Sequence, residues 1–318
     1  MTDTLPVIDV AAPGAASVLG RALEEIGFAY VAGHGVPQSV IDGAFAASRA
    51  FHASTLAQKQ SLAINAWHRG YMGMATSTVV TSSVAKVTRP NLSESLMIMH
   101  EPAPDEIGEP LQGPNQWPDW LPGFRPAIET YRQAAERVSR TVIRLIATAL
   151  GLPETALDRH FDRPTSFLRL LHYPPHPVDA ADDQFGAAPH TDYGIITLLA
   201  QDDSGGLQVR RRDAAGGDGG WIDAAPLPGT FVLNVADMLA RWTNDRFVST
   251  PHRVVNRSGG DRYSLPFFFD TAMDSIIECL PTCTGPGNPP RYEPVRYGDY
   301  LMDRLNRNYD YRKSEAAE

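Results

Sequence analysis

The sequence predicts a mainly β protein of the α+β class, with a sandwich or barrel of short strands and helices packed around it. From Ser166 onward, short apolar runs alternate with turn residues. Strand runs at this spacing are typical of sandwiches and barrels rather than of alternating β/α units. A long helical pattern, with apolar residues on one face, precedes them and predicts an outer helix. The strand runs cover 166–173, 195–200, 206–210, 230–235, 246–256 and 262–269.

The first hundred residues predict a mixture of strands and helices. Apolar runs indicate strands over 5–10 and 28–31, and apolar residues at helical spacing indicate helices over 16–26 and 39–62. Glycines and a proline over 33–37 predict a turn between the strand over 28–31 and the helix over 39–62. His34 lies in this turn and is expected to be a turn histidine rather than a ligand. A strand is expected over 93–100, followed by an irregular, proline-rich segment over 101–123.

The long helix is expected over 124–150, because Pro126 suits its first turn and Gly151 suits its end. Beyond the strand runs, 212–220 resembles the tip of a hairpin and 296–309 could form a final helix. The polar tail after Arg312 is expected to be disordered.

Composition excludes some classes of function. The 318 residues carry a formal net charge of −9, which gives no electrostatic case for binding nucleic acid. Apolar runs are too short to cross a bilayer, and the N-terminus has no signal peptide pattern. Cys279 and Cys283 are expected to be reduced thiols, so we expect a cytoplasmic protein without a membrane partner. The oligomeric state is not indicated.

Half of a metal site is visible in the stretch from Pro189 to Leu199. Side chains alternate faces in an extended chain, so His190 and Asp192 are expected to point the same way. His252, in a second strand-like run, could complete the site. Two imidazoles and one carboxylate leave open positions on a metal, which suits non-haem Fe(II) in oxygen chemistry. The alternative is two separate histidines, each satisfied by local hydrogen bonds.

A carboxylate clamp is the second candidate feature. Arg262 and Ser264 share a face of a predicted strand, and a guanidinium beside a hydroxyl fits a carboxylate. Tyr173 could add another hydroxyl. Each residue also has a plainer explanation when it is taken singly. The arginine could form a structural ion pair, and the tyrosine could pack in the core.

Together the motifs resemble the 2-oxoglutarate/Fe(II)-dependent dioxygenases of the isopenicillin N synthase-like family. The chain has a His-x-Asp stretch, an Asn-x-x-Asp-x-Leu segment, a second histidine and an Arg-x-Ser pair, in the same order as in this family. Gly27-Phe28 and His34-Gly35-Val36-Pro37 also resemble its entry motif. Ala236 stands where the family usually has Gly, and His172 departs from the Asn-Tyr-Tyr-Pro of many plant members. The matching stretches are 189–194, 234–239, 249–254 and 262–264.

The resemblance implies a double-stranded β-helix, or jelly roll, with helices outside. It implies four segments: an N-terminal α/β region closing the substrate side (1–123), a helical prop (124–165), the Fe(II)/2-oxoglutarate core (166–275) and a C-terminal helix and tail (276–318). It also implies Fe(II) held by His190, Asp192 and His252, with 2-oxoglutarate reaching Arg262, Ser264 and Tyr173. O2 would complete the set, and a small molecule would be oxidised, most often hydroxylated, with release of succinate and CO2.

Two other functions remain open from the sequence. An oxidase of the same fold would use no 2-oxoglutarate, and Arg262 and Ser264 would then hold the substrate's own carboxylate. A jelly-roll binding module would do no chemistry. The substrate is not indicated, although its pocket is expected to draw on 69–74, 76–99, Phe268 and the final helix.

Overall fold

The protein, described here by a computed structural model, is built on one large sheet and a smaller one. The description covers residues 4–76, 89–105, 107, 109–177, 181, 183–212, 218–309 and 311–312. The large sheet has eight strands in the order β1-β2-β10-β7-β12-β5-β4-β3, all paired antiparallel except β1 with β2. Their bounds are β1 Val7–Asp9, β2 Phe28–Ala32, β3 Gly70–Met72, β4 Glu94–Met99, β5 Thr165–Tyr173, β7 Ile196–Gln201, β10 Phe231–Val235 and β12 Arg262–Asp270.

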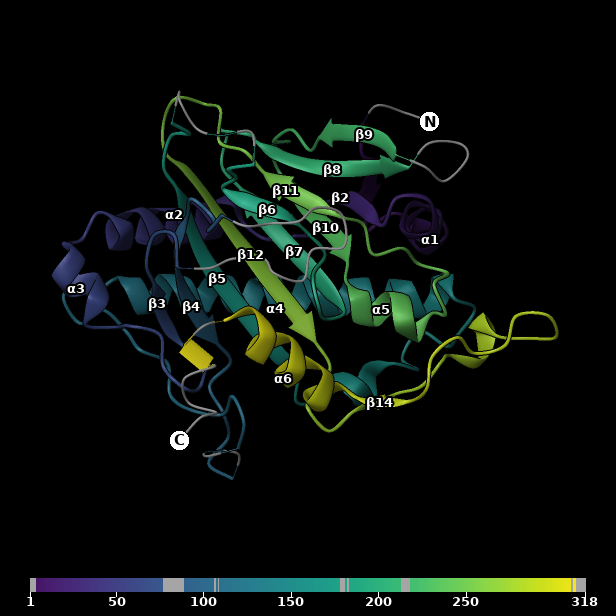
Figure 1. Cartoon of the computed structure of the whole chain (residues 1–318). Coiled ribbons are helices and arrows are strands. Elements are labelled where there is room, and N and C mark those ends of the chain that lie inside the picture. The colour runs from purple at the N-terminus through teal and green to yellow at the C-terminus, as the bar shows by residue number, and fades with distance from the viewer. Residues whose placement is uncertain are drawn as a thin grey trace.

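The smaller sheet has four antiparallel strands in the order β6-β11-β8-β9. It lies on the opposite side of the large sheet from the long helix α4, Phe124–Ala149 (Figure 1). A third, two-stranded sheet pairs β13 with β14. The bounds are β6 Ala187–His190, β8 Leu207–Arg212, β9 Asp218–Asp223, β11 His252–Val254, β13 Ile276–Ile277 and β14 Val295–Arg296.

Three of the helices, α1 (Ala15–Glu25), α2 (Gln38–His52) and α4 (Phe124–Ala149), cover the outer face of the large sheet. The longest, α4, runs behind the strands in Figure 1, and the Tyr131 hydroxyl on it donates to the Leu265 carbonyl of β12. Alternate β12 residues Leu265, Phe267 and Phe269 are buried in the main core with α4. The helices are α1 Ala15–Glu25, α2 Gln38–His52, α3 Leu56–Gln60, α4 Phe124–Ala149, α5 Asp237–Trp242 and α6 Tyr297–Asn308, with short 3-10 turns at Asp158–Phe161 and Pro281–Cys283.

The predicted mainly β core is confirmed, and so are the outer helix over 124–150 and the final helix. Two boundaries were wrong. The helix expected over 39–62 is two helices, because Thr55 starts a new one with a capping box to Gln58. The strand expected over 246–256 is only β11, since α5 and a turn precede it. The tail beyond Arg312 lies outside the described residues.

Two apolar residues of the predicted helical ranges are exposed: Val18 of α1 and Leu56 of α3 are 42% and 58% exposed. Of the helices described, none is long and apolar enough to cross a membrane.

A buried ionic cluster joins the outer face of the sheet to α3. The Glu94 carboxylate accepts hydrogen bonds from Lys59 Nζ at 2.8 Å, from His172 Nδ1 at 2.9 Å and from the Tyr71 hydroxyl. The His172 ring also stacks on Tyr263, with centroids 4.9 Å apart. Because side chains alternate along β5 and β12, these residues lie behind Tyr173, Arg262 and Ser264.

Candidate metal centre and active site

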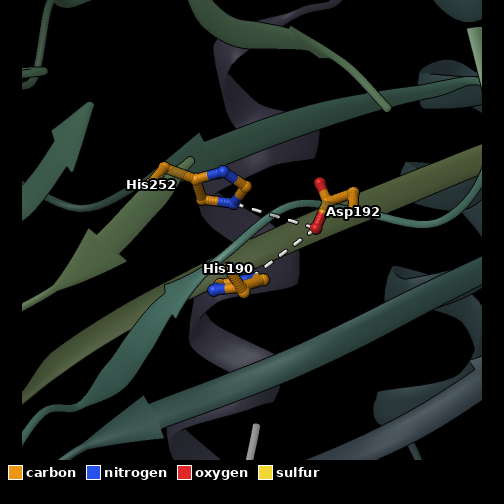
Figure 2. Close-up of side chains that lie close together, drawn as sticks. All are labelled: His190, Asp192 and His252. Atoms are coloured by element: carbon orange, nitrogen blue, oxygen red, sulfur yellow. Dashed lines mark ion pairs between the residues drawn. The ribbon is translucent and has the colours of Figure 1, made fainter. Parts of the chain in front are cut away.

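Three side chains that the sequence singled out converge between the two sheets. The Nε2 atoms of His190 and His252 each lie 3.7 Å from Asp192 Oδ1, and one ligand atom of each residue lies within 4.8 Å of the others (Figure 2). This is the one group of metal-ligating side chains found among the described residues. The arrangement leaves room for a single ion facing all three atoms.

The backbone explains this convergence. His190 ends β6 and His252 begins β11, and the two are direct partners in the antiparallel pairing of these strands. Asp192 lies just past the end of β6, in the link to β7. The prediction that His190 and Asp192 point the same way therefore holds, although the strand itself stops at His190.

Both histidines present Nε2 to the centre. His190 Nδ1 lies 2.7 Å from the Ala188 carbonyl oxygen, and His252 Nδ1 lies 3.3 Å from the Thr250 carbonyl oxygen. A carbonyl can only accept, so each Nδ1 donates, and the lone pair of the neutral imidazole is then on Nε2. Burial lowers the pKa of His190 to about 4, which keeps this imidazole neutral at physiological pH.

The carboxylate of Asp192 is oriented by two neighbours. The Thr197 hydroxyl and Asn234 Nδ2, the latter at 2.8 Å, both donate to Oδ2. Oδ1 is thus left to face the histidines. Burial acts to raise the pKa of Asp192, but the neighbouring imidazoles and these two hydrogen bonds outweigh it and lower the pKa, which favours the charged, ligating form.

Arg262 is fully buried, and none of the described carboxylates forms an ion pair with it. Its Nε donates to the Gly205 carbonyl at 2.6 Å, and its guanidinium lies 4.7 Å from the centroid of the Tyr173 ring. Within the described part of the chain, Nη1 and Nη2 have no hydrogen-bond partner. A buried charge left in this state is costly, so the site is complementary to an incoming carboxylate. Ser264, also buried, lies on the same face of β12.

All six predicted site residues line one cavity of about 1320 Å³, measured out to its open mouth. It also includes Met97, Phe268 and α6 residues Leu301, Leu305 and Asn308, as expected for the substrate side. Residues 69–74 are not part of this lining; Arg69 donates to the Trp67 and His100 carbonyls, and the Tyr71 hydroxyl donates to Glu94. Of the expected stretch 76–99, residues 77–88 lie outside the description.

Several lining residues were missed, among them His68, Arg169, Phe167 and Asn234. A sequence signal existed for two of them. Phe167, Arg169, Leu171 and Tyr173 alternate along β5, so a site at Tyr173 implies that the other three share its face. His34 stays apart from the centre as expected, and its Nδ1 accepts the Val36 amide at 3.1 Å.

Comparison with known proteins agrees with this geometry. The 2OG-Fe(II) oxygenase superfamily matches residues 164–271, and the N-terminal region of non-haem dioxygenase in morphine synthesis matches 5–120. The 2-oxoglutarate-Fe(II) type oxidoreductase hxnY of Emericella nidulans is 35% identical, over 92% of this chain and 85% of its own length. The chain belongs to the 2OG-Fe(II) oxygenase superfamily.

Other relatives and solved structures extend the comparison. Azadirone synthase LFS of Melia azedarach is 36% identical over 95% of this chain and 92% of its own. A full-length Neurospora crassa protein in complex with alpha-KG has a TM-score of 0.83 and 31% identity, covering 95% of each chain. JOX2 in complex with 2OG, Fe and JA has a TM-score of 0.80 and 27% identity, covering 94% of this chain and 84% of its own.

Family membership confirms the double-stranded β-helix expected from the sequence. The protein is a 2OG-Fe(II) oxygenase that uses Fe(II), 2-oxoglutarate and O2. A binding module without chemistry and an oxidase without 2-oxoglutarate are therefore set aside.

Proposed function

We propose that His190, Asp192 and His252 bind Fe(II), and that Arg262, Ser264 and Tyr173 hold 2-oxoglutarate while a small molecule is oxidised, most often by hydroxylation. The observation that carries the proposal is the set of three ligand atoms within 4.8 Å, whose other polar atoms are already hydrogen-bonded. Fe(II), when bound, would supply oxygen activation coupled to the decarboxylation of 2-oxoglutarate to succinate and CO2.

The remaining residues of the site bind 2-oxoglutarate and exclude water. Arg262 offers two free Nη atoms in a planar fork, which fits the carboxylate of 2-oxoglutarate that does not reach the metal. The Tyr173 ring supports this guanidinium from one side, and its hydroxyl is the expected third contact. Apolar side chains between the two sheets exclude water, which strengthens the charged contacts.

A small-molecule substrate is supported by the relatives. The full-length Neurospora crassa protein has been crystallised with thymine and with 5-formyluracil, and a relative from Glycine max is a homoarginine-6-hydroxylase. The cavity of this protein is lined mostly by apolar side chains with a few converging polar groups, as sites for small organic molecules usually are. The division into segments 1–123, 124–165, 166–275 and 276–318 and the cytoplasmic location stay predictions.

The decisive experiment adds 2-oxoglutarate to the Fe(II)-loaded protein without oxygen and records the visible spectrum. We expect a metal-to-ligand charge-transfer band, absent in His190→Ala and requiring far more 2-oxoglutarate in Arg262→Met. Iron binding without a band would contradict the 2-oxoglutarate contacts. Undiminished iron binding by His190→Ala would contradict the metal ligands.

A further inference from the structure

The cavity contains a second arginine that the cosubstrate does not need. Arg169 and Tyr173 lie on the same cavity-facing side of β5. At about 3.3 Å per residue, the two positions are about 13 Å apart along the strand. Tyr173 pairs with Arg262 across the sheet. The two guanidiniums therefore stand at different ends of one wall, with the metal centre facing that wall from the smaller sheet.

Arg169 is held in place without being neutralised. Its Nε donates to the Ser95 hydroxyl at 2.9 Å, and its Nη2 lies 4.0 Å from the Met72 sulfur. Within the described residues no carboxylate pairs with it, whereas surface arginines such as Arg144 have an acidic partner. A guanidinium that lines an apolar cavity with only neutral partners is complementary to an anion.

The balance of charges in the cavity with Fe(II) and 2-oxoglutarate bound also favours an anion at Arg169. Two positive charges on Fe(II) match the two negative charges of 2-oxoglutarate, and Asp192 matches Arg262. His68 adds no charge, because burial lowers its pKa to about 3. Asp270 accepts the Ile195 amide at 2.6 Å, and burial raises its pKa to about 7, which weakens its negative charge. Apart from the weakened charge of Asp270, no negative group among the described lining residues is left to match Arg169.

The surroundings of Arg169 define the rest of the ligand. Met97 is its direct partner on β4, and Phe167 lies two positions before it on β5. Phe268 and α6 residues Leu301 and Leu305 line the same cavity. Apolar walls with one planar cation favour a hydrophobic molecule that carries a single carboxylate.

We propose that Arg169 binds the carboxylate of the substrate, and that this oxygenase acts on small, largely apolar monocarboxylates. The carboxylate at Arg169 leaves the hydrocarbon part to reach toward the metal. This inference rests on the proposed function, because it assigns Arg262 to 2-oxoglutarate.

The test compares acids with their neutral isosteres. The protein is loaded with Ni(II) and 2-oxoglutarate, which form the site without turnover. Binding of phenylacetate, hydrocinnamate, cyclohexylacetate and octanoate, each beside its primary amide, is measured by calorimetry. We expect at least one acid to bind about tenfold or more tightly than its amide, the difference expected when a charge-assisted hydrogen-bonded pair is lost. The same acid should stimulate succinate release by the Fe(II) enzyme.

Variants connect this preference to one side chain. Arg169→Met should abolish the preference for acids, and Arg169→Lys should retain part of it. Arg49→Met is the matched control, because Arg49 is exposed on the outer face above the Phe45 and Tyr263 rings. It should leave the preference unchanged.

Three results would overturn the inference: amides that bind as tightly as acids, an acid preference that survives in Arg169→Met, or no acid binding below millimolar concentration. A fourth such result would come from the charge-transfer titration. If Arg169→Met weakens 2-oxoglutarate binding as strongly as Arg262→Met does, Arg169 binds the cosubstrate instead. If the wild-type protein forms no charge-transfer band at all, the proposed function fails instead.

Discussion

His252 lies directly across from His190 in the pairing of β11 with β6, and their ring centroids are 4.4 Å apart. The two imidazoles are therefore positioned by one pair of backbone segments. Asp192, in contrast, is fixed from the large sheet, because Thr197 of β7 and Asn234 of β10 hold its outer oxygen. The centre thus takes two ligands from the smaller sheet and the third from the link between β6 and β7, where the large sheet orients it.

Replacing His252 with alanine should abolish tight Fe(II) binding, because the two remaining ligands cannot occupy three positions of the ion. The metal content after dialysis gives the measurement. His34→Ala is the matched control and should bind iron normally, since His34 contacts the Val36 amide and the Phe231 ring away from the centre. Equal iron contents in the two variants would contradict the ligand set.

Asn234→Ala should weaken metal affinity by about 10–100-fold, the usual effect of removing a group that orients a ligand. Asp192 would then lose the 2.8 Å hydrogen bond that holds Oδ2 away from the metal. Competition with a chelator measures the affinity. The proposed role of Asn234 is wrong if affinity is unchanged while the variant folds normally.

Arg262→Met should separate stability from ligand binding. With Ni(II) present, 2-oxoglutarate at 100 times its Kd should stabilise the wild-type protein by about 2.7 kcal/mol. The same concentration should hardly stabilise the variant, because the free Nη atoms are gone. The variant alone should not lose much stability, since a buried, unpaired charge has been removed. Thermal unfolding with and without 2-oxoglutarate measures both effects.

The Glu94 cluster should make stability fall in acid. Burial acts to raise the pKa of Glu94, but the hydrogen bonds from His172, Lys59 and Tyr71 outweigh it and lower the pKa to about 2. A depressed carboxyl pKa stabilises the fold above the usual value of 4.5, and this contribution disappears as pH falls toward about 2. Glu94→Gln should therefore lose stability at neutral pH and approach the wild type in acid.

Lys59→Met should cost about 3–5 kcal/mol at neutral pH, because it leaves a buried carboxylate with one partner fewer. Urea unfolding measures both substitutions. Glu129→Gln is the control, since its partly exposed pair with Arg125 is worth about 0.5 kcal/mol or less. A Glu129→Gln effect as large as that of Lys59→Met would contradict the special role of the buried cluster.

Much of the site could be predicted because its residues recur at strand spacing. Arg262 and Ser264 share a face of β12 while Tyr263 points to the outer side, as alternation requires. The pairing of His252 with His190 is different. It depends on the register of two strands far apart in the sequence, which local patterns do not encode; only the order of the motifs suggests it.

Other features depend on tertiary context. Residues 39–62 have apolar positions that fit one helix, yet the capping box of Thr55 and Gln58 divides them. In the sequence, Arg169 is only one member of a mostly apolar strand. Its proposed role depends on the cavity that it lines, which the sequence does not show. Thr197 gives no signal, since a threonine in a strand is ordinary.

The wall formed by α6 has a consequence for biosynthesis. Leu301 and Leu305 line the cavity, the Tyr311 hydroxyl meets His68 across 243 positions of sequence, and Arg312 donates to the Ala66 carbonyl. The ribosome adds residues 301–312 after every metal ligand candidate has been made. A chain that stops before Leu301 would therefore keep every metal ligand candidate and lose the α6 side of the cavity.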